Sequence, residues 1–239
     1  MPQGVQSEGV FYQVRDAAER RLEAVVEPMP HPNVITGRWR TALAAAGLAV
    51  HPFSKIGSAA LYGANGVLDW FDGMKARVGN MRTQEGERLD PLIDKIINGA
   101  YLAYLGALHT HDPAFCAAAV ANIVADYCSQ RARGPVIEQL KEGMRATLHP
   151  ESCTPVDPDT PVSGNKAVFA GKLKFLLQNL AVMGMLAAGS ETSIETGATA
   201  ALCGSAVLGV IGTLQRRKIK KVLASEAVQE TAADANGNS

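Results

Sequence analysis

The sequence predicts an all-α protein, a bundle of six membrane-spanning helices preceded by an amphipathic helix beside the membrane. Three observations support this prediction. Six apolar runs with few or no charges follow one another along the chain. The longest run is rich in Gly, Ala, Ser and Thr, which allow close packing of helices in lipid. Lys and Arg residues are concentrated in every second connection between the runs.

The runs differ in length. Residues 196–214 carry no charge over 19 positions, and as a helix they can cross a hydrocarbon core of roughly 30 Å. Residues 175–190 are also uncharged, and residues 113–128 contain only Asp126. The other three runs are shorter or continue into charged sequence, and they cover residues 41–50, 56–68 and 96–108. Runs of this length also occur in buried soluble helices, so hydropathy alone leaves a soluble helical domain open.

The distribution of charge favours membrane insertion. If the six spans begin and end on one side, segments 77–88, 129–174 and 215–239 lie together and hold 15 Lys or Arg residues. The opposite connections hold only Lys55. Because positive loops stay on the cytoplasmic side, we expect both termini and the 77–88 connection there. The protein is then a multi-pass protein of the bacterial inner membrane or an equivalent membrane.

The chain divides into three parts. Residues 1–30 contain no signal-peptide core and form a cytoplasmic, juxtamembrane segment. Its apolar residues recur at helical spacing, which predicts an amphipathic surface helix or, equally, an ordinary packing helix: Val10, Phe11, Val14, Ala18, Leu22 and Val25. Residues 31–221 form the membrane domain. Residues 222–239 are rich in Ala, Asn and Glu, a composition that predicts a disordered tail.

Composition excludes several functions. The 23 Lys and Arg residues equal the 23 Asp and Glu residues, whereas a nucleic-acid-binding protein usually carries a basic excess. The four cysteines stand far apart without a CxxC pair, which excludes a cysteine zinc site and a disulfide scaffold. The histidines lack HExxH spacing, and we interpret them as loop or interface residues: His31, His51, His109, His111 and His149.

Four aspartates at the ends of the second and third spans form the most informative pattern. Asp69 and Asp72 are three residues apart, and Asp90 and Asp94 are four apart, so each pair shares a helix face. An ionised aspartate inside a span costs roughly 2.5–3.5 kcal/mol on insertion scales, so four of them need compensation. Two Mg²⁺ or Mn²⁺ ions would supply it, and such a pair clamps the attacking and leaving oxygens in phosphoryl transfer.

Small and basic residues accompany the aspartates. At about 100° per residue, Gly73 and Ala76 fall on the face of Asp69, and Gly86 falls on that of the third-span aspartates. Their small size allows a base or a diphosphate to approach the backbone, and Arg77 adds a cation that recognises phosphate or base. Each aspartate pair alone could be a solvated ion cluster with neighbouring Arg or Lys. The complete spacing D-x2-D-G-x2-A-R-x8-G-x3-D-x3-D has a chance frequency on the order of 10⁻¹⁰ per starting point.

This spacing resembles the signature of the CDP-alcohol phosphatidyltransferase family of integral membrane enzymes. The resemblance is strongest over residues 56–100 and extends more loosely over 33–221. It implies a six-helix membrane fold, a homodimer and an active site open to the cytoplasm. It also implies a reaction in which an alcohol attacks the lipid-side phosphorus of a CDP-linked lipid, CDP-diacylglycerol, and CMP leaves.

The resemblance assigns residues by position. Asp69, Asp72, Asp90 and Asp94 correspond to the ligands of two divalent metal ions, and Asp94 also corresponds to the general base. Four residues correspond to the family's nucleotide-binding positions: Asp69, Gly73, Ala76 and Arg77. Gly86 corresponds to a position where helices pack closely.

Two segments predict the acceptor alcohol. LDPLIDK (89–95) is similar to the version in phosphatidylglycerophosphate synthases and the related cardiolipin synthases. GKLKFLLQN (171–179) is similar to their GKxKTxxQ motif, with Phe175 in place of Thr. We therefore expect glycerol 3-phosphate as the acceptor. The candidate cations for its phosphate equally suit the positive-inside pattern, and they are Lys172, Lys174, Arg131 and Arg133.

Two departures from the family pattern leave other acceptors open. Asn33 and Thr36 match an Asn-x2-Thr-x2-Arg opening, but Trp39 occupies the arginine position, between Arg38 and Arg40. The fourth span ends in ADYCSQRARG without the Arg-Glu pair of glycerophosphate users. Phosphatidylglycerol, as in a cardiolipin synthase, or myo-inositol phosphate, as in a phosphatidylinositol-phosphate synthase, would suit the same metal site. A catalytically silent, metal-stabilised helical membrane protein is the alternative of another class.

Overall fold

The computed structural model describes residues 21–22, 24–156, 169–188 and 192–237. These residues contain eight α-helices, one π-helix and one short 3-10 helix, and no strand, so the all-α fold is confirmed for this part of the chain. The chain forms two compact units, one of Met1–Asp94 with Pro135–Pro161 and the other of Lys95–Gly134 with Val162–Ser239.

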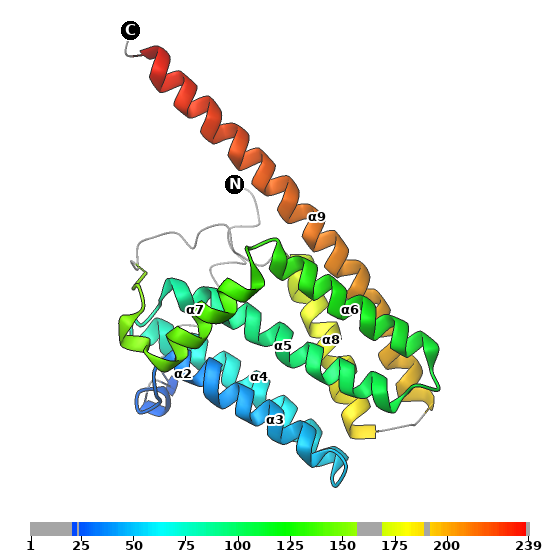
Figure 1. The fold of residues 1–239 in the computed structure, drawn as a ribbon. Helices are drawn as coiled ribbons and strands as arrows, with labels where there is room; N and C mark the ends of the chain where they lie inside the picture. The colour runs from blue at the N-terminus through cyan, green and yellow to red at the C-terminus, as the bar shows by residue number, and fades with distance from the viewer. Residues whose placement is uncertain (1–20, 23, 157–168, 189–191, 238–239) are drawn as a thin grey trace. The chain divides into compact units, whose positions relative to one another are not determined.

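The first unit is built around a pair of packed helices and the short π-helix that precedes them (Figure 1). Helix α3 (Thr41–Val50) packs along α4 (Lys55–Val78). Ser54 caps α4, because its hydroxyl oxygen accepts the Gly57 N–H at 3.0 Å. The other elements of this unit are α2 (Pro32–Val34), the π-helix η1 (Ile35–Arg40), the first turns of α5 (Gln84–Leu108), α7 (Val136–Leu148) and η2 (Pro150–Ser152).

A tight turn joins α4 to α5. Helix α4 ends at its C-cap Gly79, and Asn80 follows with φ of 48°, a left-handed conformation that asparagine tolerates better than most residues. Thr83 then accepts the Gly86 N–H at 3.1 Å and so begins α5. This turn places the end of α4 and the beginning of α5, with their acidic residues, in the same unit.

Helix α7 was not predicted from the sequence, which indicated only a long cytoplasmic connection. Its buried face carries small or polar side chains, including Gly143, Ala146 and Thr147. Its exposed face carries an apolar stripe at helical spacing, Ile137, Leu140, Met144 and Leu148. The described part of the stretch that follows contains η2 and an isolated bridge between Thr83 and Pro155.

The second unit packs α9 (Thr192–Gly237) against α6 (Pro113–Arg131) and α8 (Phe169–Ala188). Asp112 caps α6 by accepting the Ala114 and Phe115 N–H groups at 2.9 and 3.0 Å. Asn122 on α6 is fully buried and donates to the Leu202 carbonyl of α9 at 2.8 Å. Ser205 donates to the same amide at 2.5 Å. Such hydrogen bonds between helices are typical of helix packing in membranes.

The described residues of all six apolar runs lie in helices, with one run each in α3, α4, α5, α6, α8 and α9. Of the described helices, only α9, over Ser193–Gln215, is long and apolar enough to span a membrane on composition. Leu173–Ala187 in α8 is a shorter apolar helix. The reason is visible in α4 and α5, whose lengths include the acidic and basic residues beside the runs. The structure thus contains one clear apolar span, and six spans remain a prediction.

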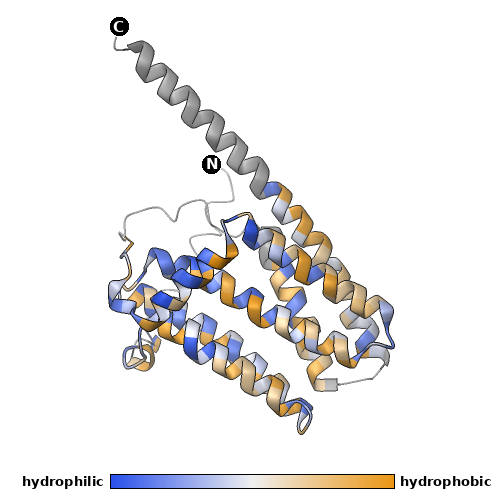
Figure 2. Cartoon of the chain, in the orientation of Figure 1, coloured by the Kyte–Doolittle hydropathy of each residue, from blue (hydrophilic) through white to orange (hydrophobic). Residues whose placement is uncertain are grey.

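Helix α9 is apolar on the outside as well as the inside. Only 28% of its most apolar window is buried, and Val207, Val210 and Leu214 are each more than half exposed. A core helix of a soluble protein would bury most of such a window. Figure 2 shows hydrophobic colouring over much of α6, α8 and the described part of α9. Outward apolar residues along a helix are expected where it contacts lipid.

The sequence predicts an amphipathic helix near the N-terminus and a disordered tail at the C-terminus, and the structure bears differently on the two. Val10, Phe11, Val14 and Ala18 lie outside the described residues, while Leu22 is half-buried and Val25 exposed. Helix α9 continues to Gly237, although the composition of 222–239 predicts disorder. Ala is the strongest helix former, and five of the residues 222–239 are Ala.

Gly37 provides a test of how tightly the π-helix packs on α7. A Cβ at Gly37 would overlap the side chain of Thr147, including its Cβ at 2.8 Å. No rotamer change can move that Cβ. We expect Gly37→Ala to destabilise the protein by about 1–3 kcal/mol, the usual cost of overpacking, measured as a lower thermal midpoint in detergent.

Two further variants control this measurement. Thr147→Ala in the Gly37→Ala background removes two of the three overlapping atoms and should recover part of the loss. Gly66→Ala on α4 adds a Cβ that meets nothing within 4 Å, so it should leave the midpoint unchanged or raise it. Equal losses for both glycine variants would show that the Thr147 contact is not the cause.

Candidate metal and nucleotide site

The four aspartates lie in the first unit and converge on the π-helix. Asp69 and Asp72 are near the end of α4, and Asp90 and Asp94 are in the first turns of α5. Thr36 and Arg40, four residues apart on the π-helix, contact all four carboxylates between them. The expectation that the two pairs come together is therefore met by the geometry of this unit.

Thr36 joins the carboxylates of the two helices. Its buried hydroxyl lies 2.6 Å from Oδ2 of Asp72 and 3.0 Å from Oδ1 of Asp90. A hydroxyl has one proton, so it donates to one of these oxygens at a time. The two carboxylates share a single neutral donor, which leaves most of their negative charge to be offset by other groups.

Arg40 is the cation at the centre of the cluster. Its Nη1 lies 2.5 Å from Oδ1 of Asp69 and 3.8 Å from Oδ2 of Asp72, and its Nη2 pairs with Asp94. Asn65 fixes the arginine, because its side-chain oxygen accepts the Nε–H at 3.3 Å and its amide donates to the Arg40 carbonyl at 2.6 Å. Asn65 thus holds both the backbone and the side chain of Arg40 in place.

The π-helix explains the incomplete match of the Asn-x2-Thr-x2-Arg opening. A π-helix closes i→i+5 hydrogen bonds and so has a wider turn than an α-helix. On the wider turn the residue four positions after Thr36 shares its face, and that residue is Arg40. Trp39, at the arginine position of the pattern, is 45% exposed. The arginine is present in the structure but one residue later than the linear pattern indicates.

The donor set suits hard divalent cations. The four carboxylates carry more negative charge than Arg40 can offset, and all the potential ligands are oxygens, as Mg²⁺ and Mn²⁺ require. Within the described residues, Oδ2 of Asp69, Oδ1 of Asp72 and Oδ2 of Asp90 take part in no hydrogen bond or ion pair. Each of these three residues therefore keeps one oxygen for a metal ion while the other contacts the π-helix.

Gly86 packs closely on a polar cluster beside the site. A Cβ at Gly86 would lie 2.6 Å from Oδ1 of Asn33 and 2.9 Å from the Thr83 hydroxyl. Asn33 donates to that hydroxyl at 3.2 Å and receives support from His31, whose Nδ1 accepts the Asn33 N–H at 3.2 Å. Burial lowers the pKa of His31, which favours the neutral, accepting imidazole. The close-packing position expected for Gly86 is what the geometry has.

The proposed nucleotide positions lie on a more open part of α4. A Cβ at Gly73 would meet only Nη1 of Arg77, at 3.4 Å, so the helix backbone has space beside it. Ala76 is half-buried and Arg77 is exposed. One turn of α4 therefore presents a bare backbone and a guanidinium next to Asp69 and Asp72.

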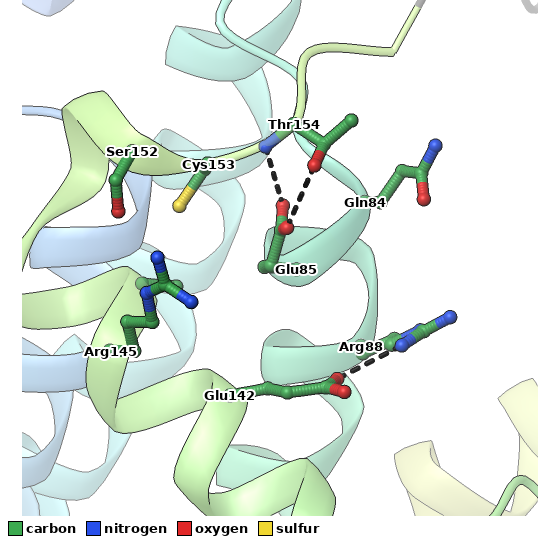
Figure 3. A pocket seen from close by; sticks show the side chains of 9 residues that line it. Gln84, Glu85, Arg88, Glu142, Arg145, Ser152, Cys153 and Thr154 are labelled. Atoms are coloured by element: carbon green, nitrogen blue, oxygen red, sulfur yellow. Dashed lines mark hydrogen bonds and ion pairs between the residues drawn. The ribbon is translucent and has the colours of Figure 1, made fainter.

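A separate cavity of ≈ 350 Å³ lies in the first unit, between the start of α5, α7 and the segment after η2 (Figure 3). Glu85 accepts the N–H and hydroxyl of Thr154 at 3.0 and 3.1 Å, and Arg88 pairs with Glu142 at 2.9 Å. None of the four aspartates lines it. Cys153 is also on its wall, and burial raises the pKa of this thiol. Sequence reasoning did not find this cavity, because α7 was not predicted.

The acceptor-phosphate candidates belong to the second unit. Lys174 is buried, and its ammonium contacts Asp126 at 2.6 Å and Gln178 at 2.9 Å. Arg131 is exposed at the end of α6, and Arg133 is half-buried just after it. The side chain of Lys172 lies outside the described residues. Lys174 is thus neutralised by a carboxylate in this structure, and a contact with a substrate phosphate would have to compete with Asp126.

The sequence of this site matches a known protein family. The family model for CDP-alcohol phosphatidyltransferase matches residues 29–211, which include the Thr36–Arg40 turn and all four aspartates. The chain belongs to the CDP-alcohol phosphatidyltransferase family. No curated protein and no solved structure matches it. This phosphatidyltransferase is an enzyme of phospholipid biosynthesis from a membrane protein family, and it transfers a phosphatidyl group from a CDP-alcohol to an acceptor.

The position of Arg40 among the aspartates predicts how the stability of this phosphatidyltransferase depends on metal ions. Without its guanidinium, the carboxylates depend on divalent cations for compensation. We expect Arg40→Gln to lose about 3–5 kcal/mol of stability in a chelator, as for a broken buried ion pair, and to recover much of it when Mg²⁺ is added. The measurement is the thermal midpoint in detergent with EDTA and with Mg²⁺.

Arg38→Gln is the matched control, because Arg38 lies two residues away on the same π-helix and is exposed. It should respond to Mg²⁺ as the wild type does. If Arg40→Gln and Arg38→Gln gain equally from Mg²⁺, Arg40 does not share the charge of the aspartates.

Proposed function

We propose that the enzyme transfers the phosphatidyl group of CDP-diacylglycerol to glycerol 3-phosphate, releasing CMP and forming phosphatidylglycerophosphate. The observation that carries the catalytic part is the convergence of four carboxylates on one turn of π-helix. The similarity of LDPLIDK and GKLKFLLQN to phosphatidylglycerophosphate synthases supports the acceptor. A homodimer with its active sites open to the cytoplasm is part of the same proposal and rests on the family resemblance.

The chain's own residues have separate tasks in this reaction. Asp69, Asp72, Asp90 and Asp94 would hold two Mg²⁺ or Mn²⁺ ions. When bound, these ions neutralise the diphosphate and stabilise the leaving CMP. Gly73, Ala76 and Arg77 receive the cytidine nucleotide beside Asp69, where the α4 backbone is open.

Asp94 is the proposed general base. The acceptor hydroxyl gives its proton to the Asp94 carboxylate as its oxygen forms a bond to the lipid-side phosphorus. The bond from that phosphorus to the CMP oxygen breaks, and CMP leaves with the electron pair. The ion pair between Asp94 and Arg40 orients the carboxylate that accepts the proton.

Membrane insertion through six spans completes the proposal. The outward apolar residues of α9, such as Val207 and Val210, support contact with lipid. The exposed stripe of α7, which includes Ile137 and Met144, supports a position of this helix at the membrane surface, with its charged residues toward water.

Replacing Asp94 separates an enzyme from a catalytically silent membrane protein. We expect wild-type protein to release CMP from CDP-diacylglycerol in the presence of Mg²⁺, and Asp94→Asn to lose about 10²–10⁴-fold, the usual contribution of a general base. Mg²⁺-dependent thermal stabilisation should persist, because three other aspartates remain. A wild-type protein that releases no CMP with any acceptor would support the silent alternative.

A panel of acceptors identifies the alcohol. Purified protein with CDP-diacylglycerol is offered glycerol 3-phosphate, myo-inositol phosphate, phosphatidylglycerol or serine, and CMP release is measured. We expect the highest kcat/KM with glycerol 3-phosphate. A clear preference for inositol phosphate or phosphatidylglycerol would overturn the acceptor and leave the metal site intact; the missing Arg-Glu pair after the fourth span is the feature that favours these alternatives.

A further inference from the structure

A second cluster of potential metal ligands lies in the second unit. His109 directly follows the last residue of α5, His111 is in the connection to α6, and Glu195 is in the first turn of α9. Oε1 of Glu195 lies 3.0 Å from Nδ1 of His109 and 3.3 Å from Nε2 of His111. The three ligand atoms all lie within 4.8 Å of one another.

We propose that His109, His111 and Glu195 bind one divalent transition-metal ion of the Zn²⁺ type. Zinc binds imidazole nitrogen and carboxylate oxygen at about 2.0–2.2 Å, most often in a tetrahedron. The edges of such a tetrahedron are about 3.3–3.5 Å long. The two measured separations from Glu195 are close to this length, so a small adjustment of the side chains brings all three atoms to bonding distance.

The surroundings hold two of the ligands in place. The Asp112 N–H donates to the His109 carbonyl at 3.0 Å, and the His109 ring lies 5.6 Å from the ring of Phe115 between centroids. Thr199 donates to the Glu195 carbonyl at 2.9 Å. The side chains of His109 and Glu195 are only 8% and 12% exposed. His111 is 62% exposed, so it can rotate onto an ion and leaves a coordination position open to water.

Charge supports a cation at this position. Within the described part of the chain, the two imidazoles are the only basic side chains that contact the Glu195 carboxylate. Imidazole binds metal in its neutral form, and then a mostly buried carboxylate has no positive charge beside it. A divalent ion supplies that charge and satisfies both imidazole lone pairs.

Ligand chemistry distinguishes this site from the aspartate site. Two nitrogens and one oxygen favour Zn²⁺ and its neighbours in the transition series, whereas an all-oxygen set favours Mg²⁺ and Mn²⁺. Within the second unit, the ion connects the α5–α6 connection to the beginning of α9. It therefore stabilises the contact of these segments through binding energy available only to the folded state.

The test measures Zn²⁺ affinity of the full chain in detergent, purified without a histidine tag and stripped of metal. Excess Mg²⁺ occupies the aspartate site during equilibrium dialysis against Zn²⁺. We expect one Zn²⁺ per chain in the wild type. His111→Ala and Glu195→Gln should each weaken this binding by at least about 100-fold, since even outer ligand partners contribute 10–100-fold. His149→Ala should not change it, because His149 is an exposed histidine beside Glu151.

A second readout covers the fold. Zn²⁺ should raise the thermal midpoint of the wild type and of His149→Ala, but not of His111→Ala, whose exposed side chain is not needed for folding. CMP release in Mg²⁺ should be the same for all these variants, so the outcome is independent of the proposed reaction. Binding of Zn²⁺ that survives both His111→Ala and Glu195→Gln, or no binding by the wild type, would overturn the proposal.

Discussion

The compensation of clustered negative charge is the constraint on which this structure depends. Four carboxylates from two helices meet at a partly buried site, where the side chain of Asp72 is 3% exposed and that of Asp69 35% exposed. Like charges that lie so close repel one another, most strongly where the surroundings have a low dielectric constant. Two groups from one turn of the π-helix contact these carboxylates and partly compensate their charge, the Thr36 hydroxyl and the Arg40 guanidinium. The acids carry more negative charge than Arg40 offsets, and we propose that hard divalent ions compensate for the rest.

The π-helix is the local device that makes this arrangement possible. In a regular α-helix both Trp39 and Arg40 would lie near the face of Thr36. The wider turn gives Arg40 the inner face and leaves Trp39 outside. Asn65 then binds both ends of the arginine. Gly37 within this turn and Gly86 in α5 have no room for a Cβ, so small residues set how closely the surrounding segments approach.

Much of the fold and the central acids could be predicted from the sequence, because they depend on short-range periodicity. The described residues of all six apolar runs lie in helices, and the i,i+3 and i,i+4 spacings place the aspartates as expected. Arg40 could not be assigned, because a π-bulge shifts the register by one residue without any signal in a linear pattern. Helix α7 was missed because its buried face is small and polar rather than apolar. The pairing of Glu195 with His109 joins residues 86 positions apart, which spacing rules cannot detect.

The buried pair of Lys174 and Asp126 bears on the choice of acceptor. Lys174 sits at the second lysine of the motif that is similar to GKxKTxxQ, and Gln178 on the next turn contacts both partners. An ammonium held in this way carries no net charge to offer, because the adjacent carboxylate cancels it. Separating the pair to admit a phosphate would leave Asp126 buried and unpaired, which is costly. Exposed Arg131, the last residue of α6, has no such cost. We therefore propose Arg131 rather than Lys174 as a contact for an acceptor phosphate, while the pair of Lys174 and Asp126 joins α8 to α6.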